Sequence, residues 1–120
     1  MEGFVAGWGR EEITNSMLSI PKVVGIKIVS EANCRSFSVL IKNLITSRTL
    51  CAGNRDNTGP CVGDSGSGLM IWDNQNQRWL LRAIVSVGET FKANQRCNLQ
   101  EYVVYCDVAK HLEWVQSNML

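Results

Sequence analysis

The most informative stretch of the sequence is Gly59-Pro60-Cys61-Val62-Gly63-Asp64-Ser65-Gly66-Ser67-Gly68. Its glycines let the backbone turn so that successive N–H groups converge, which makes a cradle for an anion or an oxyanion. The stretch lacks the Gly-Lys-Ser/Thr ending of a phosphate-binding loop, so a nucleotide ligand is disfavoured. Ser65 lies between Asp64 and Gly66, where its hydroxyl can be exposed, so it is a candidate nucleophile. The alternative, which the Ser-Gly pair alone would favour, is a plain turn of Gly, Ser and Asp residues.

Short apolar segments surround this loop and alternate with polar turns. The first is the stretch Phe4–Ala6, and the expected strands are Leu18–Val29, Thr49–Ala52, Leu69–Trp72, Trp79–Val87 and Tyr102–Val108. Ser30 is a suitable N-cap for a short helix. Apolar residues recur every three or four positions from Val108 to Met119, which predicts a terminal helix. Many short strands and one terminal helix indicate an antiparallel barrel or sandwich. Residues 10–17 are expected to form a loop.

Length and composition limit the class of protein. The chain has 120 residues, which is the length of one domain or part of one. Its net charge of +1 does not predict binding to nucleic acid or to an anionic membrane. Its hydrophobic content of 45% excludes disorder. No apolar run approaches the ~18 residues of a membrane span. The first residues carry neither the basic nor the apolar region of a signal peptide, so none is expected in this chain.

The cysteines predict an extracellular compartment, although this chain shows no signal peptide. The five cysteines include no C-x-x-C pair, which excludes zinc-ribbon and thioredoxin readings. Cys97, Cys106 and His111 lack zinc-finger spacing, so neither a metal nor another cofactor is expected. Buried free thiols are one alternative. A secreted disulfide framework fits the loop-rich sequence better and predicts an extracellular protein. Since the chain shows no export signal, we expect an N-terminal part to be missing.

Several motifs occur in an order that resembles a known family. They are Val5-Ala6-Gly7-Trp8-Gly9, Thr49-Leu50-Cys51-Ala52-Gly53, Cys61-Val62-Gly63-Asp64-Ser65-Gly66, Ile84-Val85-Ser86 and the segment Val108–Val115. Together they resemble the trypsin/chymotrypsin-like serine proteases (peptidase S1), and are similar to some insect cascade and immune proteases and homologues. That family's domain has two six-stranded barrels with the site between them. The resemblance implies that residues 1–120 are its C-terminal half: an all-β fold, the second antiparallel barrel, with a short intermediate helix and a C-terminal α-helix.

The resemblance implies a role for each matching residue of the central loop. Ser65 matches the nucleophile. The backbone N–H groups of Gly63 and Ser65 match the oxyanion hole, which stabilises the charge of the tetrahedral intermediate. Asp64 matches the acid that pairs with a newly freed amino terminus on zymogen activation. The implied substrate is a polypeptide, without nucleic acid or membrane.

The resemblance also assigns residues to substrate binding. Ser86, Val87 and Gly88 match the segment that binds the substrate main chain as an added strand. Gly59 matches the floor of the specificity pocket, and Gly88 and Val103 match its walls. No acid stands at the floor, and Val103 replaces a usual glycine. The expected preference is a small aliphatic residue before the cleaved bond, or the pocket is blocked.

The cysteines match two family disulfides, Cys34–Cys51 and Cys61–Cys97. Cys106 lies where the family usually has no disulfide, so it is either a free thiol or a partner for a cysteine in missing sequence. Ser67 replaces a usual glycine and adds a side chain close to the oxyanion loop.

The catalytic His and Asp of the family come from the first barrel, which this chain lacks. Its single histidine, His111, is expected to be a solvated helix residue. Without a base the chain alone should be nearly inactive. The first hypothesis is a serine endopeptidase that needs its missing N-terminal barrel for His and Asp. The second is a non-catalytic homologue that acts as a binding or regulatory module, and an unrelated secreted β-module is a remote third.

Overall fold

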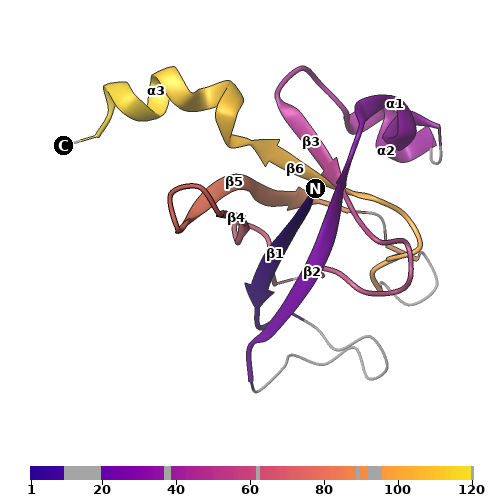
Figure 1. Ribbon diagram of the computed structural model, residues 1–120. Coiled ribbons are helices and arrows are strands. Elements are labelled where there is room, and N and C mark those ends of the chain that lie inside the picture. Colours follow the sequence, from indigo (N-terminus) through magenta and orange to yellow (C-terminus); the bar gives the residue numbers. More distant parts are fainter. Residues whose placement is uncertain (10–19, 37–38, 62, 89, 92–95, 120) are drawn as a thin grey trace.

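In the computed structural model of the chain, the described residues are 1–9, 20–36, 39–61, 63–88, 90–91 and 96–119. Six strands close into an antiparallel barrel in the order β1-β2-β3-β6-β5-β4 (Figure 1). This confirms the predicted six-stranded barrel. The loop expected at residues 10–17 and the start of the strand expected from Leu18 lie outside the described residues.

The strands match the apolar segments of the sequence closely. They are β1 (Glu2–Gly7), β2 (Lys22–Val29), β3 (Thr49–Ala52), β4 (Gly68–Asp73), β5 (Arg78–Val87) and β6 (Val103–Asp107). A hairpin joins β4 and β5 with Trp72 opposite Trp79. Its turn is fixed by Asp73, whose carboxylate accepts hydrogen bonds from the backbone of Gln75 and Asn76.

The side-chain alternation of a strand divides the core into two clusters. On β6, Val103 and Tyr105 point into the barrel, where they pack with residues such as Leu69. Val104 points to the other face and packs with Ile41 in a second cluster. Neighbouring residues of a strand point to opposite faces, so one strand serves both clusters.

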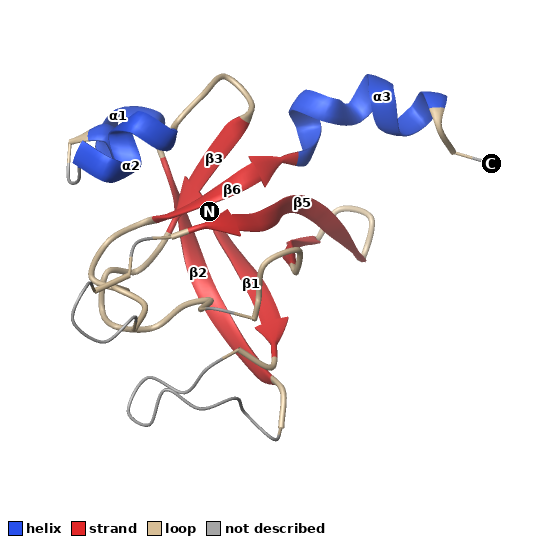
Figure 2. Ribbon diagram, turned by 180° about the vertical axis from the view of Figure 1, so that it is seen from behind, coloured by secondary structure: helices blue, strands red, loops and turns tan. Residues whose placement is uncertain are grey.

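Two short helices cover that second cluster. The predicted helix is α1 (Glu31–Arg35), and the side chain of Ser30 caps it by accepting a hydrogen bond from the Asn33 amide. A second helix, α2 (Val39–Leu44), is not predicted from the sequence. It supplies buried Ile41, and both helices lie on the side of the barrel away from the C terminus (Figure 2).

The chain ends in the predicted terminal helix, which begins as a 3-10 turn. This turn, η1 (Val108–His111), precedes α3 (Leu112–Ser117). Asp107 caps the turn through the Ala109 amide and pairs with Arg82. The helix projects from the barrel (Figure 1), and its apolar residues Leu112 and Trp114 are 50% and 68% exposed. None of the helices in the described segments is long and apolar enough to cross a bilayer.

Both predicted disulfides are present. Cys34–Cys51 ties α1 to β3, and Cys61–Cys97 ties the central loop to the segment before β6. Cys106 is a free, half-buried thiol on β6.

Candidate active site

The central loop has the backbone conformation that its glycines predict. Gly63 and Gly66 have φ angles of 101° and 88°, in the left-handed region that favours glycine. The amide of Gly66 donates to the carbonyl of Val85, and the amide of Val85 donates to the carbonyl of Ser67, each at 2.9 Å. These two bonds hold the loop against β5, so the loop forms a fixed turn at the edge of the barrel.

Asp64 connects this loop to the end of β1. Its buried carboxylate accepts hydrogen bonds from the backbone amides of Gly9 and Cys61, both at 2.9 Å. A Cβ atom at Gly7 or Gly9 would lie 2.0 or 2.3 Å from the nearest oxygen of Asp64. A side chain at either position would push the Asp64 carboxylate away from its two hydrogen bonds, so glycine at residues 7 and 9 suits the position of Asp64. The role of Asp64 in activation stays a prediction.

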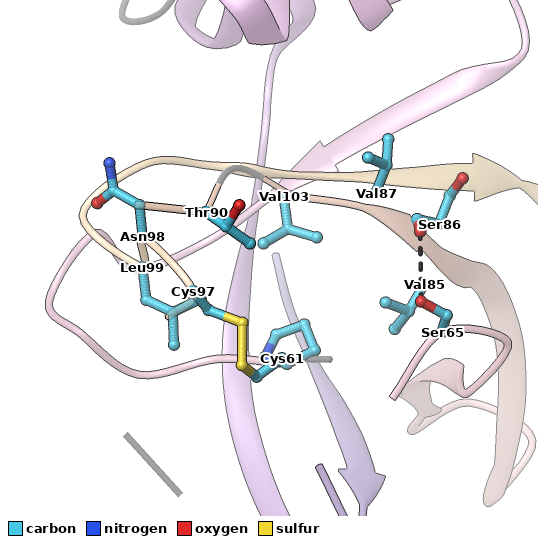
Figure 3. A pocket seen from close by; sticks show the side chains of 12 residues that line it. Cys61, Ser65, Val85, Ser86, Val87, Thr90, Cys97, Asn98, Leu99 and Val103 are labelled. Carbon is cyan, nitrogen blue, oxygen red and sulfur yellow. Dashed lines mark hydrogen bonds between the residues drawn. A yellow bond between two sulfur atoms is a disulfide. The ribbon is translucent and has the colours of Figure 1, made fainter. Parts of the chain in front are cut away.

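Ser65 presents its hydroxyl at the surface of this turn. The hydroxyl donates to the carbonyl of Ser86 at 3.5 Å, which is a long contact (Figure 3). Within the described residues, the amides of Gly63 and Ser65 donate no hydrogen bond. The turn thus presents a hydroxyl and two available N–H donors next to one another in sequence. Their use as an oxyanion hole stays a prediction.

Ser65 also lines a cavity of about 190 Å³. Four of the five predicted substrate-binding residues share that lining: Ser86, Val87, Gly88 and Val103. The other described residues that line it are Pro60, Cys61, Val85, Thr90, Cys97, Asn98 and Leu99. In Figure 3, Ser65 and Ser86 lie on one side of the cavity, and Leu99 and Asn98 on the other.

Gly59, the predicted floor, is not among the residues that line the cavity. A Cβ atom at Gly59 would lie 3.4 Å from Cδ2 of Leu99. Gly59 is thus a neighbour of Leu99, which does line the cavity, and the role of Gly59 as a floor stays a prediction. Sequence reasoning missed Leu99, because its position depends on the disulfide at Cys97 and on the hydrogen bond from the Asn57 amide to its carbonyl.

Two further residues occupy positions away from the cavity. Ser67 lines a separate groove with Phe4, Met70 and Trp79 and is not among the residues that line the cavity beside Ser65. His111 lines a third hollow, of about 440 Å³, beside Trp114. Neither side chain contributes to the cavity beside Ser65.

Among the described residues, the pKa shifts do not point to a catalytic base. Burial raises the pKa of Tyr105 well above its usual range, and the nearby charge of Asp64 adds to this effect. The Tyr105 hydroxyl has no hydrogen-bond partner among the described residues. No group of three His, Cys, Asp or Glu side chains in the described part of the chain is arranged to hold a metal ion.

Comparison with known protein families agrees with the barrel and the loop. The family described as Trypsin matches residues 1–115. The chain belongs to this family of trypsin-like serine proteases.

The chain is similar to several curated proteins. Serine protease gd of Drosophila melanogaster is 33% identical over 96% of this chain, and CLIP domain-containing serine protease B9 of Anopheles gambiae is 34% identical over 97%. Haptoglobin of Mesocricetus auratus is 27% identical over 98%. The predicted similarity to insect proteases is thus confirmed. The chain spans 27% of the length of each of the two insect relatives and 36% of that haptoglobin.

Proposed function

We propose that residues 1–120 are the second barrel of a serine endopeptidase domain, with Ser65 as its nucleophile. The observation that carries this proposal is the fixed turn in which an exposed Ser65 hydroxyl lies beside the available amides of Gly63 and Ser65. Attack of Oγ on a peptide carbonyl makes a tetrahedral intermediate with a negatively charged oxygen. The two amides stabilise that charge.

The nucleophile needs a base that the described residues do not place beside it. The hydroxyl of Ser65 donates to the Ser86 carbonyl, which is not a general base. In this family a histidine takes the proton and an aspartate orients it, and without a triad member roughly 10³–10⁴-fold catalysis over water remains. We therefore assign His and Asp to a first barrel, and expect the 120-residue chain alone to be nearly inactive.

A groove next to the nucleophile loop supports docking of that first barrel. The groove has a volume of about 590 Å³ and is lined by Phe4, Ala6, Val23, Ser67, Gly68, Met70 and Trp79. Trp79 is 52% exposed and makes edge contacts with Phe4 and Trp72. An apolar surface of this kind typically marks an interface. Because Ser67 lines the groove, its occupant would lie two residues from Ser65.

The substrate class and compartment follow from the same proposal. The substrate is a polypeptide that enters the cavity beside Ser65 next to Ser86, Val87 and Gly88. The two disulfides of the chain favour an oxidising environment. The proposed location is therefore extracellular.

The second candidate is a non-catalytic homologue that binds a polypeptide with the same cavity. It is favoured by the absence of a base beside Ser65 in the described residues. It requires the same fold and the same loop, so only chemistry at Ser65 separates it from the first candidate.

A fluorophosphonate probe applied to the protein from its native source tests this choice. The expected result is covalent labelling of Ser65, lost in Ser65→Ala. The matched control is Ser67→Ala, which removes a hydroxyl from the same loop but outside the cavity and should keep the label. A folded, disulfide-bonded protein that stays unlabelled would support the binding module instead.

A further inference from the structure

We propose that the hollow beside the terminal helix binds an acidic segment of another polypeptide, through carboxylate groups and a neighbouring apolar side chain. The hollow has a volume of about 440 Å³ and is lined by Arg48, Lys110, His111, Glu113, Trp114 and Ser117. None of these residues lines the cavity beside Ser65 or the groove that Ser67 lines. The proposal therefore concerns a second binding surface and does not depend on chemistry at Ser65.

The fold builds this hollow from two distant parts of the sequence. Four of its residues are spaced three or four positions apart, which places them on one side of η1 and α3. They are Lys110, Glu113, Trp114 and Ser117. Arg48 comes from the loop before β3, and its carbonyl accepts a hydrogen bond from the Asp107 amide at 2.9 Å. Because Asp107 also caps η1 through the Ala109 amide, one residue holds both parts of the hollow in place.

The charge of the lining favours a negatively charged ligand. Arg48 and Lys110 are exposed, and neither makes an ion pair within the described part of the chain. These two cations outnumber the one carboxylate of the lining, that of Glu113, so the hollow keeps an excess of positive charge. Half-buried His111 adds a ring N–H donor. A ligand with carboxylate groups would supply the counter-charges that both cations lack.

Trp114 adds a large apolar surface beside these cations. It is 68% exposed on a helix that projects from the barrel (Figure 1), although tryptophan side chains are usually well buried. Exposed aromatic side chains of this size are frequent anchors at binding surfaces. The hydroxyl of Ser117 already donates to the Glu113 carbonyl at 2.8 Å. The ligand that completes the hollow therefore carries an apolar side chain next to its carboxylates.

The single carboxylate of the lining favours a peptide over a sulfated polysaccharide. A densely charged polymer gains affinity with the number of cations that it neutralises, whereas this lining offers two cations and places Glu113 among them. A short peptide can place its carboxylates on Arg48 and Lys110 and an uncharged side chain beside Glu113. The volume of about 440 Å³ also lies within the range of roughly 300–1,000 Å³ that is typical of ligand sites.

The test is a titration of the ¹⁵N-labelled, disulfide-bonded chain with acetyl-Glu-Asp-Tyr-Glu-Asp-amide at low ionic strength, under NMR detection. We expect the indole N–H signal of Trp114 to shift, and the peptide with Gln and Asn in place of Glu and Asp to bind about tenfold more weakly. Addition of salt should also weaken binding. Equal binding of the neutral peptide, or no shift of the Trp114 signal with either peptide, overturns the proposal. Tighter binding of a heparin-derived oligosaccharide at the same signal overturns the choice of a peptide.

Three variants separate this hollow from the rest of the surface. Arg48→Gln combined with Lys110→Gln removes both cations and should weaken the acidic peptide about fivefold. Glu113→Gln removes the opposing carboxylate and should strengthen binding about twofold, which is a gain that an unfolded variant cannot give. The matched control is Lys22→Gln combined with Lys42→Gln, which removes two exposed cations from β2 and α2 and should leave the affinity unchanged. Unchanged affinity in the first variant, or an equal loss in the control, contradicts the assignment.

Discussion

The clearest test of the nucleophile loop is Asp64→Asn. The carboxylate of Asp64 is buried and accepts one hydrogen bond from the Gly9 amide and one from the Cys61 amide. Asparagine keeps one carbonyl oxygen and turns its NH₂ group toward the second donor, so one bond is replaced by two donors that face each other. A hydrogen bond to a charged group contributes roughly 1.5–3 kcal/mol, and the orphaned buried donor costs a similar amount.

We therefore expect Asp64→Asn to lower the free energy of unfolding by about 3 kcal/mol or more. For a chain of this length, this corresponds to a fall in Tm of roughly 10 °C. Calorimetry of the disulfide-bonded chain measures the change, and the same variant in the native protein should label less with fluorophosphonate. The control is Glu113→Gln on the exposed surface of α3, which should stay within about 0.5 kcal/mol. An Asp64→Asn variant within 1 kcal/mol of the parent would refute the reasoning.

Three further changes test other parts of the barrel. Asp107→Ala leaves half-buried Arg82 without its partner and removes the cap of η1, so denaturant unfolding should show a loss of about 2–4 kcal/mol. Tyr105→Phe removes a buried hydroxyl that has no hydrogen-bond partner among the described residues. Thermal melting should therefore give a free energy of unfolding that is higher than that of the parent or at most about 1 kcal/mol lower, and a larger loss contradicts this. The side chain of Asn76 is the main cause of the lowered pKa of Asp73, so that carboxylate stabilises the turn above its ordinary pKa and the contribution is lost as pH falls through the lowered value. Asn76→Ala should raise the pKa of Asp73 in a ¹³C-detected NMR titration, and an unchanged pKa would exclude this cause.

The parts of the fold that were predictable depend on local signals. The segment at Thr49–Ala52 forms a strand with the same bounds as expected, because a short β-branched and apolar run between polar turns has few other conformations. Ser30 caps α1 as predicted, since an N-cap acts on the residues directly after it. Glycine permits the left-handed φ angles found at Gly63 and Gly66, so a turn in this loop is expected from its composition.

The parts that were missed depend on long-range packing. The helix α2 is six residues long and is held by the cluster that Ile41 shares with Val104 on β6. Leu99 lines the cavity, and its carbonyl accepts a hydrogen bond from the distant Asn57 amide. The bond between Asp64 and the Gly9 amide spans 55 positions. A pattern in one sequence carries no direct signal for any of these three contacts.

The central loop links the two surfaces that function would require. Ser65 lines the cavity, Ser67 lines the apolar groove, and both are held to one residue of β5, since Val85 accepts from Gly66 and donates to Ser67. A partner that fills the groove would therefore contact the same short turn that carries Ser65. A first barrel docked there would bring His and Asp to a turn that the two Val85 hydrogen bonds already hold in place.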